Sequence, residues 1–221
     1  MNLKEELGEW YELLSPEFKK PYMVKIGKQI TLDLSRIQPA LSDILRVYRE
    51  CPPAGVKVVI MGQDPYYNGT ADGFAFSTRA KTIPASLRVI FKELERTGYG
   101  LRTNADLTDW VSQGVFLLNA SLTTTSGVAG AHKSLGWEKF IQATLAHIIN
   151  RDQPYVFIAW GRDAQNIIDK ATVSKSSNWM ILKGIHPAAT LYNPTLSFDT
   201  NHFNLTNEYL VRNNKTPIKW V

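Results

Sequence analysis

Polar side chains of unlike chemistry follow the apolar runs of this chain, each at the point where a run ends. The runs and the polar residues beside them are VKVVIMG (56–62) with Gln63 and Asp64, GVFLLN (114–119) with its own Asn119, YVFIAWG (155–161) with Arg162, and WMILKG (179–184) with His186. Short apolar runs bounded by glycine are typical of buried strands, where an unpaired polar group is costly. A carboxylate, an imidazole and an amide could together hold a planar heterocycle and polarise it.

Each of these residues also has a structural alternative. Asp64 could cap a turn, Asn119 could bind loop backbone, and His186 could be a hydrogen-bonded structural histidine. For any one of them alone the structural alternative is favoured. Ligands of open α/β sheets bind in the crevice outside the carboxyl ends of the strands. Because the polar groups all lie at that end of a proposed strand, the sequence predicts one shared site.

The elements that must position these groups alternate along the chain. Strands are predicted at 56–61, 114–119, 155–160 and 179–184. Helical periodicity and end signals predict helices at 3–14, 41–48, 84–98, 105–113, 137–150, 163–170 and 202–214. Alternating strands and helices imply an α/β layer architecture with both faces of the sheet covered. We therefore expect an α/β/α sandwich around a mostly parallel four-stranded sheet.

Composition fits one compact domain. The 221 residues are 44% hydrophobic and 20% charged, so we expect a single domain spanning residues 1–221. The net charge of +5 is compatible with a polyanionic partner but is also common in proteins that bind none. Since like charges form no block, any nucleic-acid surface must be assembled by folding.

Other signals concern compartment and cofactors. Cys51 is the only cysteine, the amino terminus has no secretion signal, and no run of 18 apolar residues occurs. We therefore expect a soluble, intracellular, cytoplasmic protein with no membrane partner. The four histidines and the cysteine lack metal-ligand spacing, and the glycines form no nucleotide-binding motif. Neither a metal nor a cofactor is expected.

Several motifs together carry a resemblance to a known family. They are GQDPYY (62–67), GFAFS (73–77), GVFLLN (114–119), HKSLGWEKF (132–140), WG (160–161) and HP (186–187). In this order and spacing the chain resembles a family 1 uracil-DNA glycosylase over nearly its whole length. The resemblance implies hydrolysis, without a metal, of the bond between uracil and deoxyribose in DNA. It further implies a base-excision repair enzyme that leaves an abasic site.

The resemblance implies roles for the catalytic residues. A base inside a duplex is unreachable, so the nucleotide must be flipped into a pocket or come from a single strand. Asp64 would orient the attacking water and offset the positive charge that develops on the sugar. His186, as a neutral imidazole, would donate a hydrogen bond to O2 of the leaving uracil. Gln63 would contact the flipped nucleotide.

Three further residues would recognise the base. Phe76 would stack on the uracil ring, although core packing is a plausible alternative. Asn119 would accept from N3–H and donate to O4, a pattern that cytosine reverses. Tyr66 would press against C5 and exclude the thymine methyl group, although it could instead be a tyrosine on the pocket rim.

Four residues would contact the DNA backbone. Ser86 lies in a turn that resembles the family's phosphate-binding loop, Lys133 and Ser134 lie in a second DNA-facing segment, and Arg162 follows the WG motif. For each of them a solvated surface residue is an equally serious alternative. We expect a monomer that acts on uracil in single- and double-stranded DNA, and that could be the target of a protein inhibitor of such enzymes.

The chain departs from the family pattern at two places. Tyr67 stands where the family usually has histidine, and residues 186–192 read HPAATLY where the family has HPSPLS. Ala188 cannot make the phosphate hydrogen bond of a serine. A wedge residue fills the hole left by a flipped base; direct register puts Thr190 there, whereas chemistry favours Leu191. Fewer prolines in this segment predict a relative preference for single strands.

Two other functions remain open at this point. The chain could be a glycosylase-fold binding module or replication scaffold without turnover, although a scaffold has no need of Asp64, Asn119 and His186 together. It could also excise a different damaged or mispaired base, although Asn119 with Tyr66 favours uracil.

Overall fold

The four predicted strands form one parallel sheet in the computed structural model, which describes residues 2–173 and 178–221. The strands are β2 (Val58–Gly62), β3 (Val115–Asn119), β5 (Tyr155–Trp160) and β6 (Trp179–Gly184). Their order is β3-β2-β5-β6, and every neighbouring pair is parallel. The predicted sheet is confirmed. All four carboxyl ends lie at one edge, which we call the carboxyl edge.

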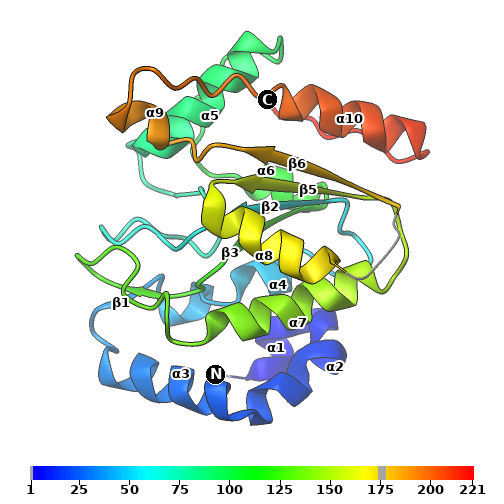
Figure 1. Ribbon diagram of the computed structural model, residues 1–221. Helices are drawn as coiled ribbons and strands as arrows, with labels where there is room; N and C mark the ends of the chain where they lie inside the picture. Colours follow the sequence, from blue (N-terminus) through cyan, green and yellow to red (C-terminus); the bar gives the residue numbers. More distant parts are fainter. Residues whose placement is uncertain (1, 174–177) are drawn as a thin grey trace.

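Helices cover both faces of this sheet, which makes the predicted α/β/α sandwich (Figure 1). One layer holds α5 (Ala85–Arg96), α9 (Ala189–Tyr192) and α10 (His202–Arg212). The other holds α4 (Arg46–Glu50), α7 (Trp137–Ile149) and α8 (Arg162–Thr172). Every residue of β2, β3 and β5 is buried, which explains why these strands read as continuous apolar runs rather than alternating ones.

The amino-terminal region differs from the prediction. The helix expected at 3–14 is divided into α1 (Leu3–Leu7), a 3₁₀ turn (Gly8–Trp10) and α2 (Tyr11–Leu14), with Gly8 at a φ of 52°. A second 3₁₀ turn (Ser15–Lys19) leads into α3 (Pro21–Leu32), which was not predicted. The helix expected at 41–48 is a 3₁₀ turn (Leu41–Asp43) followed by α4. Glycine at a left-handed φ breaks the first helix.

The remaining differences involve short elements. α6 (Thr108–Ser112) is shorter than the predicted 105–113, and Pro84 caps α5 rather than starting it. β1 (Ile37–Gln38) and β4 (Thr124–Thr125) form a small antiparallel sheet that was not predicted. Elements of two to four residues carry no periodicity for a sequence pattern to reveal. In the part of the chain that the structure describes, no helix is long and apolar enough to cross a membrane.

A buried ion pair ties the amino-terminal region to the loop after β2. Arg46 and Asp72 are 4% and 3% exposed, and Arg46 Nη1 lies 3.3 Å from Asp72 Oδ2. The guanidinium also lies 3.9 Å from the centre of the Phe74 ring. Asp72 accepts hydrogen bonds from the backbone N–H of Phe74 and from the Ser77 hydroxyl. The pair therefore fixes the GFAFS segment against α4.

Replacement of Arg46 by methionine should lower the free energy of unfolding by about 3–5 kcal/mol, because it leaves Asp72 buried without a counter-charge. Urea denaturation measures the change. The control is Arg79→Met, which breaks the exposed ion pair with Asp43 and should cost about 0–1 kcal/mol. Equal losses in the two variants would contradict the importance of the buried pair.

Candidate active site

The carboxyl edge of the sheet opens onto a small cavity of about 140 Å³. This volume is far above the roughly 15 Å³ that one water molecule needs. The cavity is lined by Gln63, Asp64, Pro65, Tyr66, Tyr67, Phe74, Phe76, Ser86, Asn119, Ala129 and His186. The structure thus brings together both predicted catalytic residues, all predicted base-contacting residues and Ser86. We call this space the base cavity.

Asn119 reaches the base cavity because β2 ends in a glycine. Gly62 is paired with Asn119 across the parallel strands, and a Cβ atom at Gly62 would overlap Oδ1 of Asn119. Asn119 is 5% exposed and lines the cavity, and within residues 2–173 and 178–221 no protein group is hydrogen-bonded to its side-chain amide. The amide is thus free to form hydrogen bonds with a ligand in the cavity. Asn119 is therefore suited to recognise a polar ligand edge.

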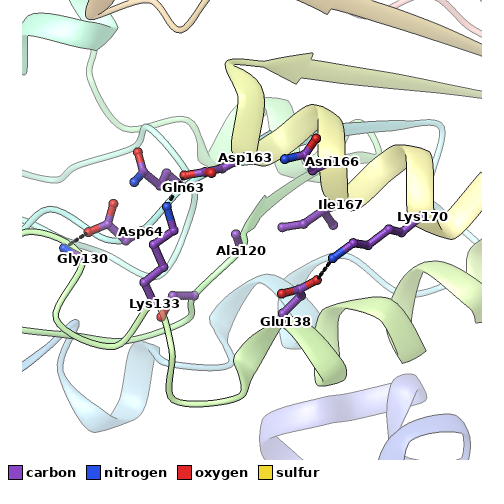
Figure 2. A pocket seen from close by; sticks show the side chains of 11 residues that line it. Gln63, Asp64, Ala120, Gly130, Lys133, Glu138, Asp163, Asn166, Ile167 and Lys170 are labelled. Atoms are coloured by element: carbon purple, nitrogen blue, oxygen red, sulfur yellow. Dashed lines mark hydrogen bonds and ion pairs between the residues drawn. The ribbon is translucent and has the colours of Figure 1, made fainter.

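Asp64 is held by a backbone donor from a distant loop. Its Oδ2 accepts the N–H of Gly130 at 2.6 Å (Figure 2). Burial raises the pKa of the Asp64 carboxyl above its usual value, while the Gly130 donor and the nearby charge of Lys133 act in the opposite direction. The carboxylate keeps its second oxygen for a ligand or a water molecule.

The tautomer of His186 follows from its backbone contact. Nδ1 accepts the N–H of Ala188 at 3.1 Å, so the proton of a neutral ring must reside on Nε2. Burial lowers the pKa of His186, against the attraction of Asp64. Gly161 has a φ of 90°, and a Cβ atom there would lie 3.0 Å from Cβ of His186. This side chain is therefore a neutral hydrogen-bond donor beside the cavity.

Phe76 forms one wall of the base cavity in a strained backbone conformation. Its φ is 66°, in the left-handed region that non-glycine residues rarely adopt. The Tyr66 hydroxyl donates to the Phe76 carbonyl at 2.9 Å and lies 3.2 Å from Ser86 Oγ. The Phe76 ring lies 6.1 Å from the His186 ring and 5.6 Å from the Trp160 ring. These contacts hold an aromatic face beside the cavity.

A second cavity of about 130 Å³ is also lined by Asp64 (Figure 2). It shares Gln63 and Asp64 with the base cavity. Two ion pairs border it, Lys133 with Asp163 and Lys170 with Glu138, each at 2.7 Å. Lys133, predicted to contact DNA, is thus paired with a carboxylate in this structure.

The other predicted DNA-contacting residues, Arg162, Ser134, Thr190 and Leu191, do not line the base cavity. Arg162 begins α8, is exposed, and has no ion pair with any residue the structure describes. Ser134 is also exposed, but it lines a separate cavity with His132. The Thr190 hydroxyl donates to the Pro187 carbonyl at 3.0 Å, whereas Leu191 is 51% exposed.

Sequence reasoning missed several residues that shape the site. Gly130 contacts Asp64 through its backbone N–H, a contribution that no sequence motif reveals. Trp160 packs edge-on against Phe76, although its motif was noted. In the described residues no group of three or more His, Cys, Asp or Glu side chains is placed to hold a metal ion.

The fold and the base cavity define an α/β protein with a ligand site at the carboxyl ends of parallel strands. Residues 48–211 match the family model described as the uracil DNA glycosylase superfamily, and the chain belongs to that superfamily. It is 38% identical over 216 residues to uracil-DNA glycosylase 1 of Listeria innocua, with 96% of each chain covered. It is 37% identical to uracil-DNA glycosylase of Phocaeicola vulgatus, with both chains fully covered.

Solved structures agree with this assignment. The crystal structure of mimivirus uracil-DNA glycosylase superimposes with a TM-score of 0.87 at 26% identity, covering all of this chain and 89% of that one. A variant of the mimivirus protein in complex with UGI gives a TM-score of 0.88 at 27% identity, covering all of this chain and 91% of that one.

Replacement of Gly62 by alanine should weaken ligand binding without unfolding the protein. The new methyl group would displace the Asn119 amide and press on Ala75, so base binding should weaken by at least the roughly 1–3 kcal/mol of an unmade buried hydrogen bond. Titration with free uracil measures binding, and circular dichroism checks the fold. Gly69→Ala is the control, because no atom lies within 4 Å of a Cβ there and its φ of 85° is also positive. Unchanged uracil binding by Gly62→Ala would refute the close-approach argument.

Proposed function

We propose that this chain is a family 1 uracil-DNA glycosylase, acting as one catalytic domain in base-excision repair. It hydrolyses the bond between N1 of uracil and C1′ of deoxyribose in DNA and leaves an abasic site. The observation that carries the proposal is the convergence of Asp64, Phe76, Asn119 and His186 on one cavity, in a member of this superfamily. Release of free uracil from uracil-containing DNA, in the presence of a chelator, tests it.

The base cavity would select uracil by shape and by hydrogen bonding. A cavity of about 140 Å³ admits a base but not a duplex, so the nucleotide must leave the stack. Phe76 would then stack on the pyrimidine ring. The free amide of Asn119 would accept from N3–H and donate to O4. Cytosine presents the reverse pattern and would leave buried polar groups unpaired.

Tyr66 would exclude thymine. Its hydroxyl is engaged with the Phe76 carbonyl and with Ser86, so the ring has a fixed orientation at the cavity wall. A ring held in this way would meet the C5 methyl group of thymine, whereas uracil carries only hydrogen there. Ser86 would then form hydrogen bonds with both the Tyr66 hydroxyl and a DNA phosphate.

The chemistry follows from the two charges that develop as the bond breaks. The electron pair of the C1′–N1 bond leaves with uracil, whose O2 becomes more negative, and the Nε2–H of His186 would donate to that oxygen. The sugar becomes positively charged, and the Asp64 carboxylate would stabilise it. Asp64 would also orient a water molecule whose oxygen bonds to C1′ and would accept its proton. Gln63 would contact the flipped nucleotide.

Phosphate contacts would come from the rim of the crevice. Arg162 is a free cation near His186 among the described residues, and Ser134 offers an exposed hydroxyl. Lys133 would have to exchange Asp163 for a phosphate, which costs little because the pair is exposed. Such contacts fix position without reading sequence. They are favoured by the net charge of +5.

We also propose that the protein acts as a monomer in the cytoplasm on uracil in both single- and double-stranded DNA. A protein inhibitor could occupy the same crevice, since the related mimivirus protein was solved in complex with UGI.

Asp64→Asn and His186→Ala should each lose most excision activity while keeping the fold. The first removes the charge that stabilises the sugar and orients water, and the second removes the donor to O2; a single such donor is worth on the order of 10²–10³-fold in rate. Single-turnover release of uracil measures the loss. Asp169→Asn and His147→Ala are matched controls, because Asp169 forms a surface pair with Lys183 away from the base cavity. Wild-type rates in both catalytic-site variants would overturn these roles.

Leu191→Ala should reduce excision from duplex DNA more than excision from a single strand, because only a duplex leaves a hole for a wedge to fill. Thr190→Ala should change the ratio little, since the Thr190 hydroxyl is bound to Pro187. Excision rates on two oligonucleotides of one sequence give the ratio, with Leu196→Ala as the control for an exposed leucine. A larger shift in Thr190→Ala would reassign the wedge.

A further inference from the structure

The loop at 126–136, between β4 and α7, carries the amide that binds Asp64. Gly130 donates to the carboxylate, and its own carbonyl accepts the N–H of Lys133 at 3.0 Å, so these residues form one turn. Both neighbours of His132 along the chain are exposed, whereas His132 is 3% exposed. His132 is therefore the side chain that anchors this turn in the protein interior.

The direction of the hydrogen bonds at one side of His132 can be assigned. The indole N–H of Trp137 can only donate, and it donates to Thr123 Oγ1 at 2.7 Å. The hydroxyl hydrogen of Thr123 is then free for Nδ1 of His132, which lies 2.8 Å away. Nδ1 can therefore accept from Thr123, an arrangement that leaves the proton of a neutral ring on Nε2.

The hydrogen bonds on the other side of the His132 ring run in the same direction. Nε2 of His132 lies 3.3 Å from Thr125 Oγ1, and the Thr125 hydroxyl donates to the carboxylate of Asp33. The same carboxylate oxygen lies 3.9 Å from Nε2. Burial lowers the pKa of His132 although Asp33 opposes it, which agrees with a neutral ring. Donors and acceptors thus run one way from Trp137 to Asp33.

We propose that this hydrogen-bonded series, Trp137 to Thr123 to His132 to Thr125 to Asp33, positions the catalytic carboxylate by holding the Gly130 amide on Asp64. We call it the His132 chain, and the inference rests on the proposed function. His132 is a positioning residue, because it lines neither cavity beside Asp64 and instead faces Lys25 and Gln29 of α3.

The His132 chain matters because Asp64 is half-buried. The Gly130 donor stabilises the ionised carboxylate against burial, together with the charge of Lys133, while Asp163 acts against it. If the turn moved, the carboxylate would lose its donor and be free to rotate. The pKa of Asp64 would rise, and the water molecule would no longer be aligned with the sugar.

The test uses His132→Leu, which removes both hydrogen bonds, and His132→Asn, whose side-chain oxygen can still accept from Thr123. In His132→Leu we expect kcat to fall on the order of 10- to 100-fold, with KM changed less than about twofold. The acid limb of the pH profile should move to higher pH, and His132→Asn should recover part of both losses. A purely structural role would lower the active fraction without moving the pH midpoint. His147→Leu, on the neighbouring helix α7, is the control and should behave as wild type.

A second readout separates this inference from the proposed function. In NMR spectra the Gly130 amide proton should follow the titration of Asp64, and it should move upfield in His132→Leu and in Thr125→Val. The amide shift can be measured even if the wild-type protein releases no uracil. Absence of uracil release would refute the proposed function but not the positioning role of His132. An unchanged Gly130 amide shift and an unchanged Asp64 midpoint in either folded variant would overturn the His132 chain as a positioning device.

Discussion

The site depends on a close approach between two strands. β2 and β3 lie in parallel register, so the last residues of both meet at the carboxyl edge, and only a glycine at position 62 leaves room for the Asn119 amide. A second glycine has the same effect after β5, where Gly161 leaves room for His186. The two glycines thus leave the space in which polar groups from separate strands converge. The closely packed sheet beneath keeps the shape of that space fixed.

Burial acts on the two proposed catalytic groups in opposite directions. It raises the pKa of Asp64 and lowers the pKa of His186, so each is pushed toward its neutral form. For His186 the neutral form is the one required, because its Nδ1 is occupied and its Nε2 carries the proton. The role proposed for Asp64 requires the charged form, and the Gly130 amide offsets part of the effect of burial. A distant loop thus adds a donor to the one group of the two whose proposed role burial opposes.

The sequence was sufficient to predict the sheet, its flanking helices and most of the base cavity. Strands such as 155–160 are buried on both faces and therefore read as apolar runs, and the polar residues that follow them mark the carboxyl edge. Gly130 could not be predicted, because its contribution is a backbone N–H delivered from 66 residues away. The ion pair between Lys133 and Asp163 could not be predicted either, because it depends on how the loop at 126–136 packs against α8. Short elements such as β1 and β4 lie below the length at which periodicity is informative.

The amino-terminal region does more than cover the sheet. Asp33 and Arg46 both lie before residue 48, where the match to the family model begins. Arg46 forms the buried ion pair that fixes the segment with Phe76, and Asp33 ends the proposed His132 chain. Both contacts place a charged group of this region beneath a loop that lines the base cavity. A strained φ at Phe76 persists only where surrounding contacts outweigh its cost of about 1–3 kcal/mol, and a buried Arg46 anchored on Asp72 provides such contacts. The amino-terminal region is thus part of the structure that sets the geometry of the site.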